Sequence, residues 1–211
     1  FPNIHCVVLT PFSHGITKRM QNEDLSIFDY VFCWLGNTNL ILSIIKLIED
    51  KMNLEHDIRE AGVQMILLVE DSIRFYSSIL PNLYNYILEQ SKNFSKEALN
   101  RHAATMRMRG RPKVVLARTY EEAKKLYDKY SNNTLGVISD ARFPLKSAAK
   151  AFGNEVEQEV KPEYGTDTFG REKCPDAGLQ LFRYIRKNDS FVPLILESSE
   201  SDNRAKAEAE G

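Results

Sequence analysis

Cysteine is scarce in this chain of 211 residues, and neither sign of charge is in excess. The three cysteines, Cys6, Cys33 and Cys174, lie far apart without a Cys-x-x-Cys pair, and the four histidines form no spaced ligand pair. This usage argues against a structural zinc site and favours a reducing compartment. Because 28 basic residues nearly balance 29 acidic ones, net charge gives no reason to expect a nucleic-acid or membrane partner.

Long apolar runs are also missing. The longest apolar stretch, residues 30–48, is interrupted by glycine, asparagine and lysine, so we expect no membrane-spanning helix. No signal peptide opens the chain, and we therefore expect a cytoplasmic location. The chain begins with Phe1 in what looks like the middle of a domain, so we expect it to be a fragment of a longer protein.

Short apolar runs alternate with amphipathic segments along most of the chain. The pattern predicts strands at 5–10, 28–35, 63–69, 113–118, 135–139 and 192–197. It predicts helices at about 40–52, 73–88, 91–112, 119–130 and 177–186, with a connector at 57–62. Pro81 lies inside the second helix and should kink or divide it. Residues 145–176 lack a clear period and are predicted to form an inserted loop.

From residue 63 onward, strand and helix alternate four times. Such alternation predicts an α/β fold with a doubly wound parallel sheet. One common sheet of this kind, the flavodoxin-like type, has the strand order 2-1-3-4. In sheets of this kind the chemistry lies at the carboxyl ends of the strands. The residues that directly follow each strand are therefore the candidates for function.

Three acidic residues lie at these strand ends. Glu70 and Asp71 follow the first strand of the sheet, and Asp140 ends the third. Because these strands are expected to be neighbours about 5 Å apart, the carboxylates would repel one another without a cation. All-oxygen ligation by few protein groups suits Mg²⁺, and an aspartate is a competent phosphoryl acceptor. Ser198, after the fourth strand, adds a hydroxyl near the same edge.

Each of these signals has a purely structural alternative. An acidic pair after a strand often caps the next helix, and a serine at a strand end is commonly a cap as well. By chemistry alone, Ser199 is as good a candidate as Ser198 for the hydroxyl at this edge. Asp140 at a second strand end makes the metal site the better interpretation. The basic residues between Arg101 and Lys113 would suit an anion or nucleic-acid site, but no aromatic residue interleaves with them. We therefore interpret them as a solvated helix face.

The spaced combination of motifs resembles the response-regulator receiver domain. The matching strings are Ile-Leu-Leu-Val-Glu-Asp-Ser (66–72), Val-Ile-Ser-Asp-Ala-Arg-Phe-Pro (137–144), Ala-Gly-Leu-Gln-Leu-Phe-Arg-Tyr-Ile-Arg (177–186) and Val-Pro-Leu-Ile-Leu-Glu-Ser-Ser (192–199). The resemblance implies that Glu70 and Asp71 bind the metal and that Asp140 binds it and accepts the phosphoryl group. It also implies that the backbone carbonyl of Arg142 is a metal ligand and that Ser198 is the switch hydroxyl.

The chain departs from the family pattern at its end. The family's active-site lysine follows a fifth strand, and the chain stops at Gly211 where that strand should begin. Residues 61–211 thus resemble a receiver without its last strand and helix, with insertions near 91–112 and 145–176. The fourth strand would be left with an open edge. We expect residues 1–60 to cover that edge, with strand 28–35 standing in for the absent one, or a second copy to pair there as a homodimer.

Residues 1–60 resemble the C-terminal half of another receiver, a partial β-α-β-α unit. Thr10 stands at its hydroxyl position, Tyr30 at its aromatic-switch position and Cys33 where its lysine should be. Since a thiol cannot supply the cation, this first unit looks incompetent for phosphorylation. Strings such as Phe-Cys-Trp-Leu-Gly-Asn also resemble the tandem-receiver region ahead of phosphoenolpyruvate-synthase-like (PEP/pyruvate-binding) domains in Bacteroidetes-type bacteria.

These observations favour a receiver in phosphorelay signal transduction (a two-component system) that is not itself an enzyme. A histidine kinase or phosphotransfer protein would phosphorylate Asp140 with Mg²⁺, and the receiver would regulate a downstream domain. The alternative is an unphosphorylated pseudo-receiver that acts as a scaffold or dimerisation module of a phosphoenolpyruvate-synthase-like enzyme. A flavodoxin-type flavin site or a haloacid-dehalogenase-like phosphatase is disfavoured, because the chain has neither a Ser/Thr/Gly-rich phosphate loop nor an Asp-x-Asp motif at the required strand end.

Overall fold

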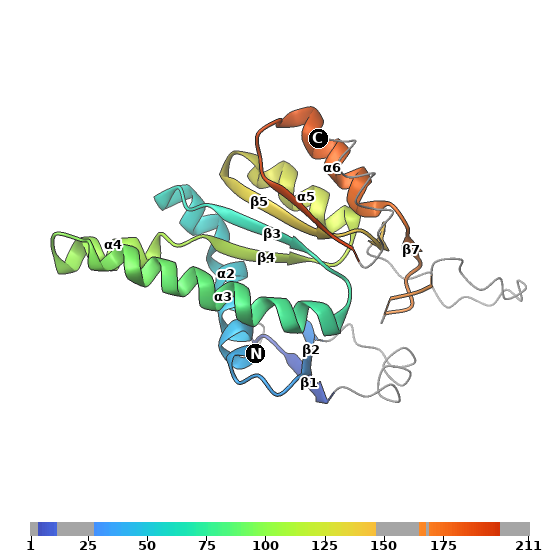
Figure 1. Cartoon of the computed structure of the whole chain (residues 1–211), viewed down its shortest axis with the longest axis horizontal. Helices are drawn as coiled ribbons and strands as arrows, with labels where there is room; N and C mark the ends of the chain where they lie inside the picture. Colours follow the sequence, from blue (N-terminus) through green and yellow to red (C-terminus); the bar gives the residue numbers. More distant parts are fainter. Residues whose placement is uncertain (1–3, 12–27, 147–164, 168, 199–211) are drawn as a thin grey trace, which may run out of the picture.

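A four-stranded parallel sheet forms the centre of the computed structural model, which describes residues 4–11, 28–146, 165–167 and 169–198 (Figure 1). The strands in spatial order are β4 (Lys113–Ala117), β3 (Met65–Val69), β5 (Thr134–Asp140) and β8 (Leu194–Glu197). Counted along the chain from β3, this is the predicted order 2-1-3-4. All three strand pairs are parallel.

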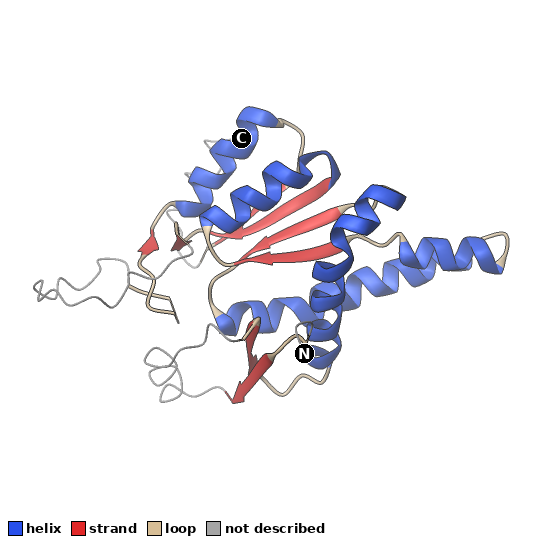
Figure 2. Cartoon of the chain, turned by 180° about the vertical axis from the view of Figure 1, so that it is seen from behind, coloured by secondary structure: helices blue, strands red, loops and turns tan. Residues whose placement is uncertain are grey.

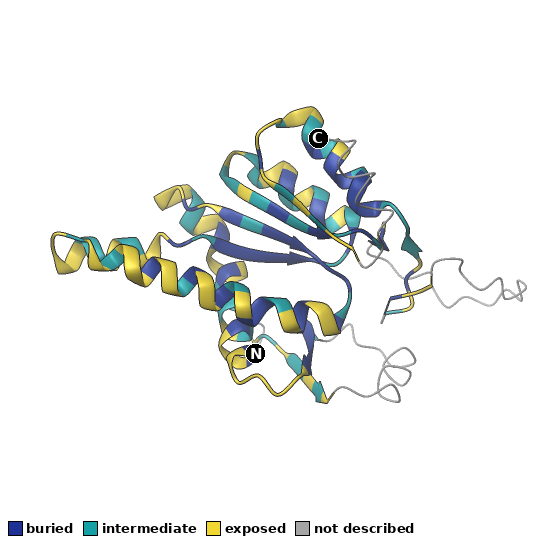
Figure 3. Cartoon of the chain, in the orientation of Figure 1, coloured by how far each residue is buried: buried dark blue, intermediate teal, exposed yellow. Residues whose placement is uncertain are grey.

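The central strand β3 is apolar throughout because both of its faces are covered. Its side chains alternate between the two faces, so Met65, Leu67 and Val69 enter one core cluster. Leu68 enters the other cluster, on the opposite face. The dark blue of β3 and β4 in Figure 3 shows how completely these strands are buried. A parallel sheet of this kind requires helices on both sides.

Helices cover both faces of the sheet. α3 (Ile73–Lys96) packs on one face, while α5 (Tyr120–Tyr130) and α6 (Ala177–Asn188) pack on the other, in front of the sheet in Figure 2. Thr119 caps α5, since its Oγ1 accepts a hydrogen bond from Glu122 N at 3.2 Å. Among the described helices, none combines the length and hydropathy that a bilayer crossing demands.

The predicted division of the second helix at Pro81 is wrong, because α3 runs unbroken for 24 residues. A proline inside a helix costs about 3 kcal/mol. Tyr76, Leu80 and Tyr84 on either side of it are completely buried. Each such side chain contributes about 1.5–3 kcal/mol on burial, so packing against the sheet outweighs the cost of the proline.

The helix predicted at 91–112 is two segments. Its first part is the end of α3, and α4 (Arg101–Arg109) follows after a turn and packs against α3. Asn100 caps α4 by accepting a hydrogen bond from Ala103 N at 2.8 Å. Arg107 joins the two helices, since its guanidinium lies 4.2 Å from the centre of the Phe94 ring and donates to the Phe94 carbonyl.

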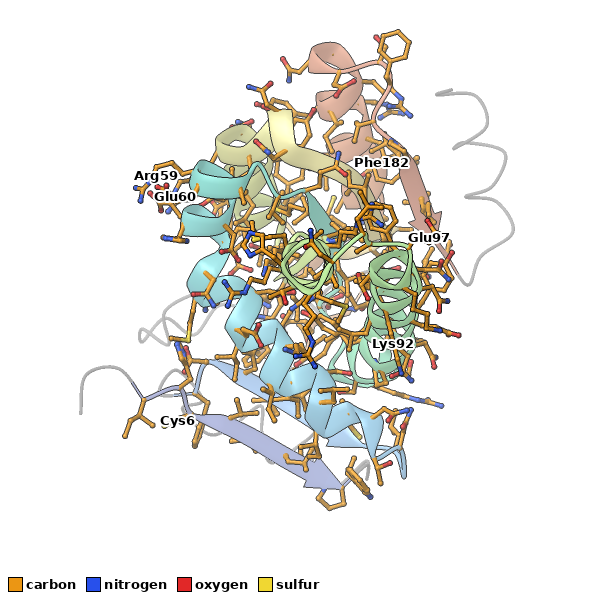
Figure 4. All side chains as sticks on the ribbon, turned by 90° about the vertical axis from the view of Figure 1, so that its left-hand side faces the viewer. Cys6, Arg59, Glu60, Lys92, Glu97 and Phe182 are labelled. Atoms are coloured by element: carbon orange, nitrogen blue, oxygen red, sulfur yellow. The ribbon has the colours of Figure 1, made fainter. Side chains whose placement is uncertain are left out.

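An N-terminal unit packs against α3. Strands β1 (Val7–Pro11) and β2 (Tyr30–Trp34) form a separate parallel pair, and α2 (Asn39–Ala61) follows them. Cys33 N donates to Ser77 Oγ of α3 at 2.9 Å, and the Tyr76 hydroxyl donates to the Val31 carbonyl. In Figure 4, α2 runs from beside β1 past α3 to its far end at Arg59 and Glu60. The apolar side chains of β2 and α2 therefore share one core cluster with α3 and the sheet.

α2 is longer than predicted, and it includes most of the segment expected to be a connector. Leu54 and Ile58 extend its apolar face and pack into the core on the face of the sheet that α5 and α6 cover. The helix ends at Gly62, whose φ of 60° is in the left-handed region. Its N–H bonds to the Ile58 carbonyl at 2.9 Å, which is a common helix ending.

The sequence predicted that residues 1–60 cover the edge of β8, but the described residues of this segment, 4–11 and 28–60, do not. β2 pairs with β1, and α2 packs against β4 at the opposite edge of the sheet. Within the described part of the chain, no strand pairs with the outer side of β8, and Ile195 of that strand is 54% exposed. Pairing of this edge with a second copy stays a prediction.

A buried carboxylate explains why α2 lies beside β4. Asp50 of α2 is fully buried and receives two hydrogen bonds from Arg111, at 2.7 and 3.0 Å. Its Oδ2 also accepts from the Tyr84 hydroxyl at 2.9 Å and from Val114 N at 3.0 Å. Lys113 is buried too and lies 2.7 Å from Asp57. The interpretation of the basic run as a solvated face is therefore wrong for its last two members, Arg111 and Lys113.

We predict that Asp50→Ala destabilises the protein by about 3–5 kcal/mol, because it leaves the guanidinium of Arg111 buried without its partner. Urea unfolding at neutral pH measures the change. Glu55→Ala is the matched control, since it removes an exposed ion pair with Lys129 that contributes less than about 1 kcal/mol. An Asp50→Ala variant as stable as the control would contradict the anchoring role of Asp50.

Candidate metal centre

The acidic residues from two strand ends meet at the carboxyl edge of the sheet. Val69, the last residue of β3, pairs in register with Ser139 of β5, so Glu70 and Asp140 come next to each other. One carboxylate oxygen from each of Glu70, Asp71 and Asp140 lies within 4.8 Å of the others. The arrowheads of the sheet strands point toward this edge, beyond which β7 lies (Figure 1). The structure therefore brings together the three acids that the sequence predicted to meet.

The three carboxyl groups are poorly solvated. Glu70 is 3% exposed and Asp71 is fully buried, while Asp140 is half-buried. Burial raises the pKa of Glu70 to about 8, and the charges of Asp140 and Asp71 add to the effect. Burial likewise raises the pKa of Asp71, to about 6, although the Lys173 ammonium opposes this shift. The pKa of Asp140 is also raised, again chiefly by burial.

Hydrogen bonds hold two of the carboxylates in place but not the third. Glu70 Oε1 accepts from Ser72 N at 2.9 Å, and Asp140 Oδ1 accepts from Ala141 N at 2.7 Å. Neither oxygen of Asp71 receives a well-aligned hydrogen bond, although both are buried. Since Asp71 bonds no backbone N–H at the start of α3, a helix cap does not explain its position.

Lys173, a basic residue that the sequence pattern did not single out, reaches this cluster. Lys173 Nζ lies 2.7 Å from Asp71 Oδ2 as an ion pair. Lys173 belongs to β7 (Lys173–Cys174), which pairs antiparallel with β6 (Phe143–Pro144) just after Asp140. No signal in the sequence pointed to it, because the segment around it has no periodicity and pairs with a strand of two residues.

The part of the predicted inserted loop that carries Lys173 contains short β-structure, which the sequence did not predict. A bridge joins Thr166 to Glu172, and Gly170, with a φ of 73°, forms the turn between them. The buried carboxylate of Asp167 accepts from Arg171 Nε at 2.7 Å and from the backbone N–H of Phe169 and Arg171. The rest of the predicted insertion, residues 147–164, lies outside the described residues.

The donor set of the cluster suits a hard divalent cation. Carboxylate oxygens are the ligands that Mg²⁺ and Ca²⁺ prefer, and Asp71 Oδ1, which is buried without a hydrogen-bond donor, is free to take such a partner. Mg²⁺–oxygen bonds of 2.0–2.1 Å place opposite ligands about 4.2 Å apart. Among three ligands of one octahedral ion at most one pair is opposite, so the three oxygens, which lie within 4.8 Å of one another, must move closer together around Mg²⁺.

The two remaining predicted site residues lie at the same edge. Ser198 directly follows β8, whose Glu197 pairs in register with Asp140, and it is exposed. The backbone N–H of Arg142 faces the carboxylate of Asp140 and lowers its pKa. The switch role of Ser198 and the ligand role of the Arg142 carbonyl stay predictions.

Comparison with known proteins adds no relative of this chain. No protein-family model, curated protein or solved structure matches it.

We predict that the metal-free protein loses stability as the pH rises from about 5 to about 8. Glu70 has a pKa of about 8 when folded, against a usual value of 4.5. Between these values the folded state holds a proton that the unfolded state has released, so rising pH favours unfolding. Glu70→Gln has no such proton, and its unfolding free energy should increase relative to that of the parent as the pH rises.

Urea unfolding of both proteins in a chelator, at several pH values, measures this difference. Glu89→Gln, at an exposed position on α3, is the control and should follow the parent at every pH. If the difference between Glu70→Gln and the parent stays constant over this range, the buried carboxylate of Glu70 is not titrating as described.

Proposed function

We propose that this chain is a receiver-type phosphorylation domain with a flavodoxin-like sheet. In this proposal Glu70, Asp71 and Asp140 hold a divalent cation, Mg²⁺, and Asp140 accepts a phosphoryl group. The observation that carries the proposal is the convergence within 4.8 Å of three carboxylates from two adjacent strand ends, two of them buried and one half-buried. A cluster of this kind suits a divalent cation, and the carboxyl edge of a parallel sheet is where ligands of such folds bind.

Asp140 is the best acceptor of the three, because it is only half-buried while Glu70 and Asp71 have almost no exposed surface. An oxygen of Asp140 attacks the phosphorus of an acyl phosphate or a phosphohistidine, and the bond from phosphorus to the carboxylate or imidazole leaving group breaks. The product is an aspartyl phosphate. The bound cation would neutralise negative charge on the transferring group.

The phosphoryl donor in this proposal is a histidine kinase or a phosphotransfer protein. The added charge would lie beside β8, whose Glu197 is in register with Asp140. Ser198 would then bond a phosphoryl oxygen, and the Arg142 carbonyl would complete the cation's ligands. The resemblance of residues 1–60 to a tandem-receiver region supports a regulatory input to a phosphoenolpyruvate-synthase-like enzyme as the setting.

One observation favours a second candidate function, an unphosphorylated scaffold module. Lys173 already neutralises Asp71 from within the chain. If this ammonium satisfies the cluster under all conditions, the site would bind neither a cation nor a phosphoryl group. Titration with Mg²⁺ separates the two functions, since a scaffold of this kind would show no saturable binding.

We predict that the chain becomes phosphorylated on incubation with acetyl phosphate and Mg²⁺, and that Asp140→Asn abolishes the reaction. An amide cannot form the acyl phosphate. Intact-protein mass spectrometry and phosphate-affinity gels detect the product, and chelation of Mg²⁺ should prevent its formation. Asp128→Asn, on the exposed face of α5, is the control and should be labelled like the parent. Equal labelling of Asp140→Asn and the parent would rule out Asp140 as the acceptor.

A further inference from the structure

The short antiparallel pair of strands β6 and β7 brings one ammonium group, that of Lys173, to the acidic cluster. Lys173 Nζ lies 2.7 Å from Asp71 Oδ2, and its side chain is 22% exposed. Its positive charge acts on Glu70 and Asp140 as well as on Asp71. The guanidinium of Arg142 also acts on Asp140, and two positive charges cannot balance three carboxylates, so the cluster keeps a deficit of positive charge when its acids are ionised.

The backbone that carries Lys173 is anchored independently of this ion pair. Lys173 pairs with Pro144 across the antiparallel β6–β7 strand pair, and its N–H donates to the Gly165 carbonyl at 3.1 Å. The neighbouring Arg171 forms an ion pair with Asp167, with Nη2 at 2.6 Å from Oδ2. The strand pair thus holds the lysine backbone in place while its long, flexible side chain ends at Asp71. The ammonium can therefore change partner without unfolding the strand pair.

The β6–β7 strand pair also follows closely on β5, the strand that ends at the proposed acceptor Asp140. β6 begins three residues after Asp140, which is the last residue of β5. Gly178 N, at the start of α6, donates to the Ala141 carbonyl at 3.1 Å, so the turn after Asp140 is held on its other side as well. Lys173 is thus attached to the loop that positions Asp140 while its ammonium contacts Asp71.

We propose that Lys173 is an exchangeable counter-ion of the candidate metal centre. In the metal-free protein its ammonium neutralises Asp71. A divalent cation that binds Glu70, Asp71 and Asp140 repels the ammonium from Asp71, and the freed side chain bonds a phosphoryl oxygen on Asp140. The second half of this inference rests on the proposed function, and the first half requires only that the cluster binds a cation.

The test compares Lys173→Met with the parent and with Lys129→Met in the full chain. Lys129 forms an exposed ion pair with Glu55 and is the matched control. Isothermal titration with Mg²⁺ should show binding about tenfold tighter in Lys173→Met, since a competing positive charge is gone. Labelling with acetyl phosphate should be roughly a hundredfold slower, because a group that stabilises the transferred charge is lost. A merely structural lysine would weaken both properties.

Lys173→Arg separates charge from packing, because it keeps the positive charge and should bind Mg²⁺ like the parent. Thermal unfolding with and without Mg²⁺ shows whether each variant is folded, and Mg²⁺ should stabilise Lys173→Met more than the parent at equal concentration. Unchanged or weaker Mg²⁺ binding in Lys173→Met would overturn the counter-ion role. Labelling as fast as that of the parent would overturn the contact with the phosphoryl group.

The failure of this inference can be told apart from the failure of the proposed function. If the parent is never labelled but Lys173→Met binds Mg²⁺ more tightly, Asp140 is not an acceptor while the counter-ion role stands. If the parent is labelled and Lys173→Met binds Mg²⁺ no more tightly, the proposed function stands and the counter-ion role is wrong.

Discussion

Repulsion among Glu70, Asp71 and Asp140 is the constraint around which the carboxyl edge of this sheet is organised. The strand register leaves the chain no way to separate them, because the end of β3 lies beside the end of β5. Burial makes the repulsion stronger, since little water is present to screen it. The edge must therefore hold protons, the Lys173 ammonium or a cation. Which of these is present decides whether the site is silent or chemically active.

Asp50 is a buried carboxylate whose negative charge and hydrogen-bonding capacity are both fully satisfied. Asp50 accepts hydrogen bonds from Arg111, Tyr84 and the backbone of β4, so its charge and both of its oxygens are satisfied. Such a network fixes the position of α2 and leaves no capacity for a ligand. Asp71 is equally buried but has one ion pair and no well-aligned hydrogen bond. This contrast within one molecule is the physical reason for assigning structure to the first carboxylate and function to the second.

The long helix α2 shows how much of an element can be predicted from the pattern of apolar residues. Its apolar positions predicted a helix correctly, and the continuation through Ile58 to Gly62 was missed because charged residues dilute the pattern there. The placement of α2 beside β4 had no local signal at all. It depends on Asp50 meeting Arg111, two residues far apart in the chain, and long-range ion pairs of this kind leave no periodicity to detect.

The pattern of the residues was enough to predict the alternation of strands and helices and the position of the acids at the strand ends. These follow from short-range periodicity and from the rules for connecting parallel strands. Three features could be seen only in the folded structure: α2 covers the β4 edge of the sheet, α3 continues through Pro81, and Lys173 reaches Asp71. Each of these depends on packing or charge between segments distant in the chain, where the free energy of the whole fold outweighs local preference.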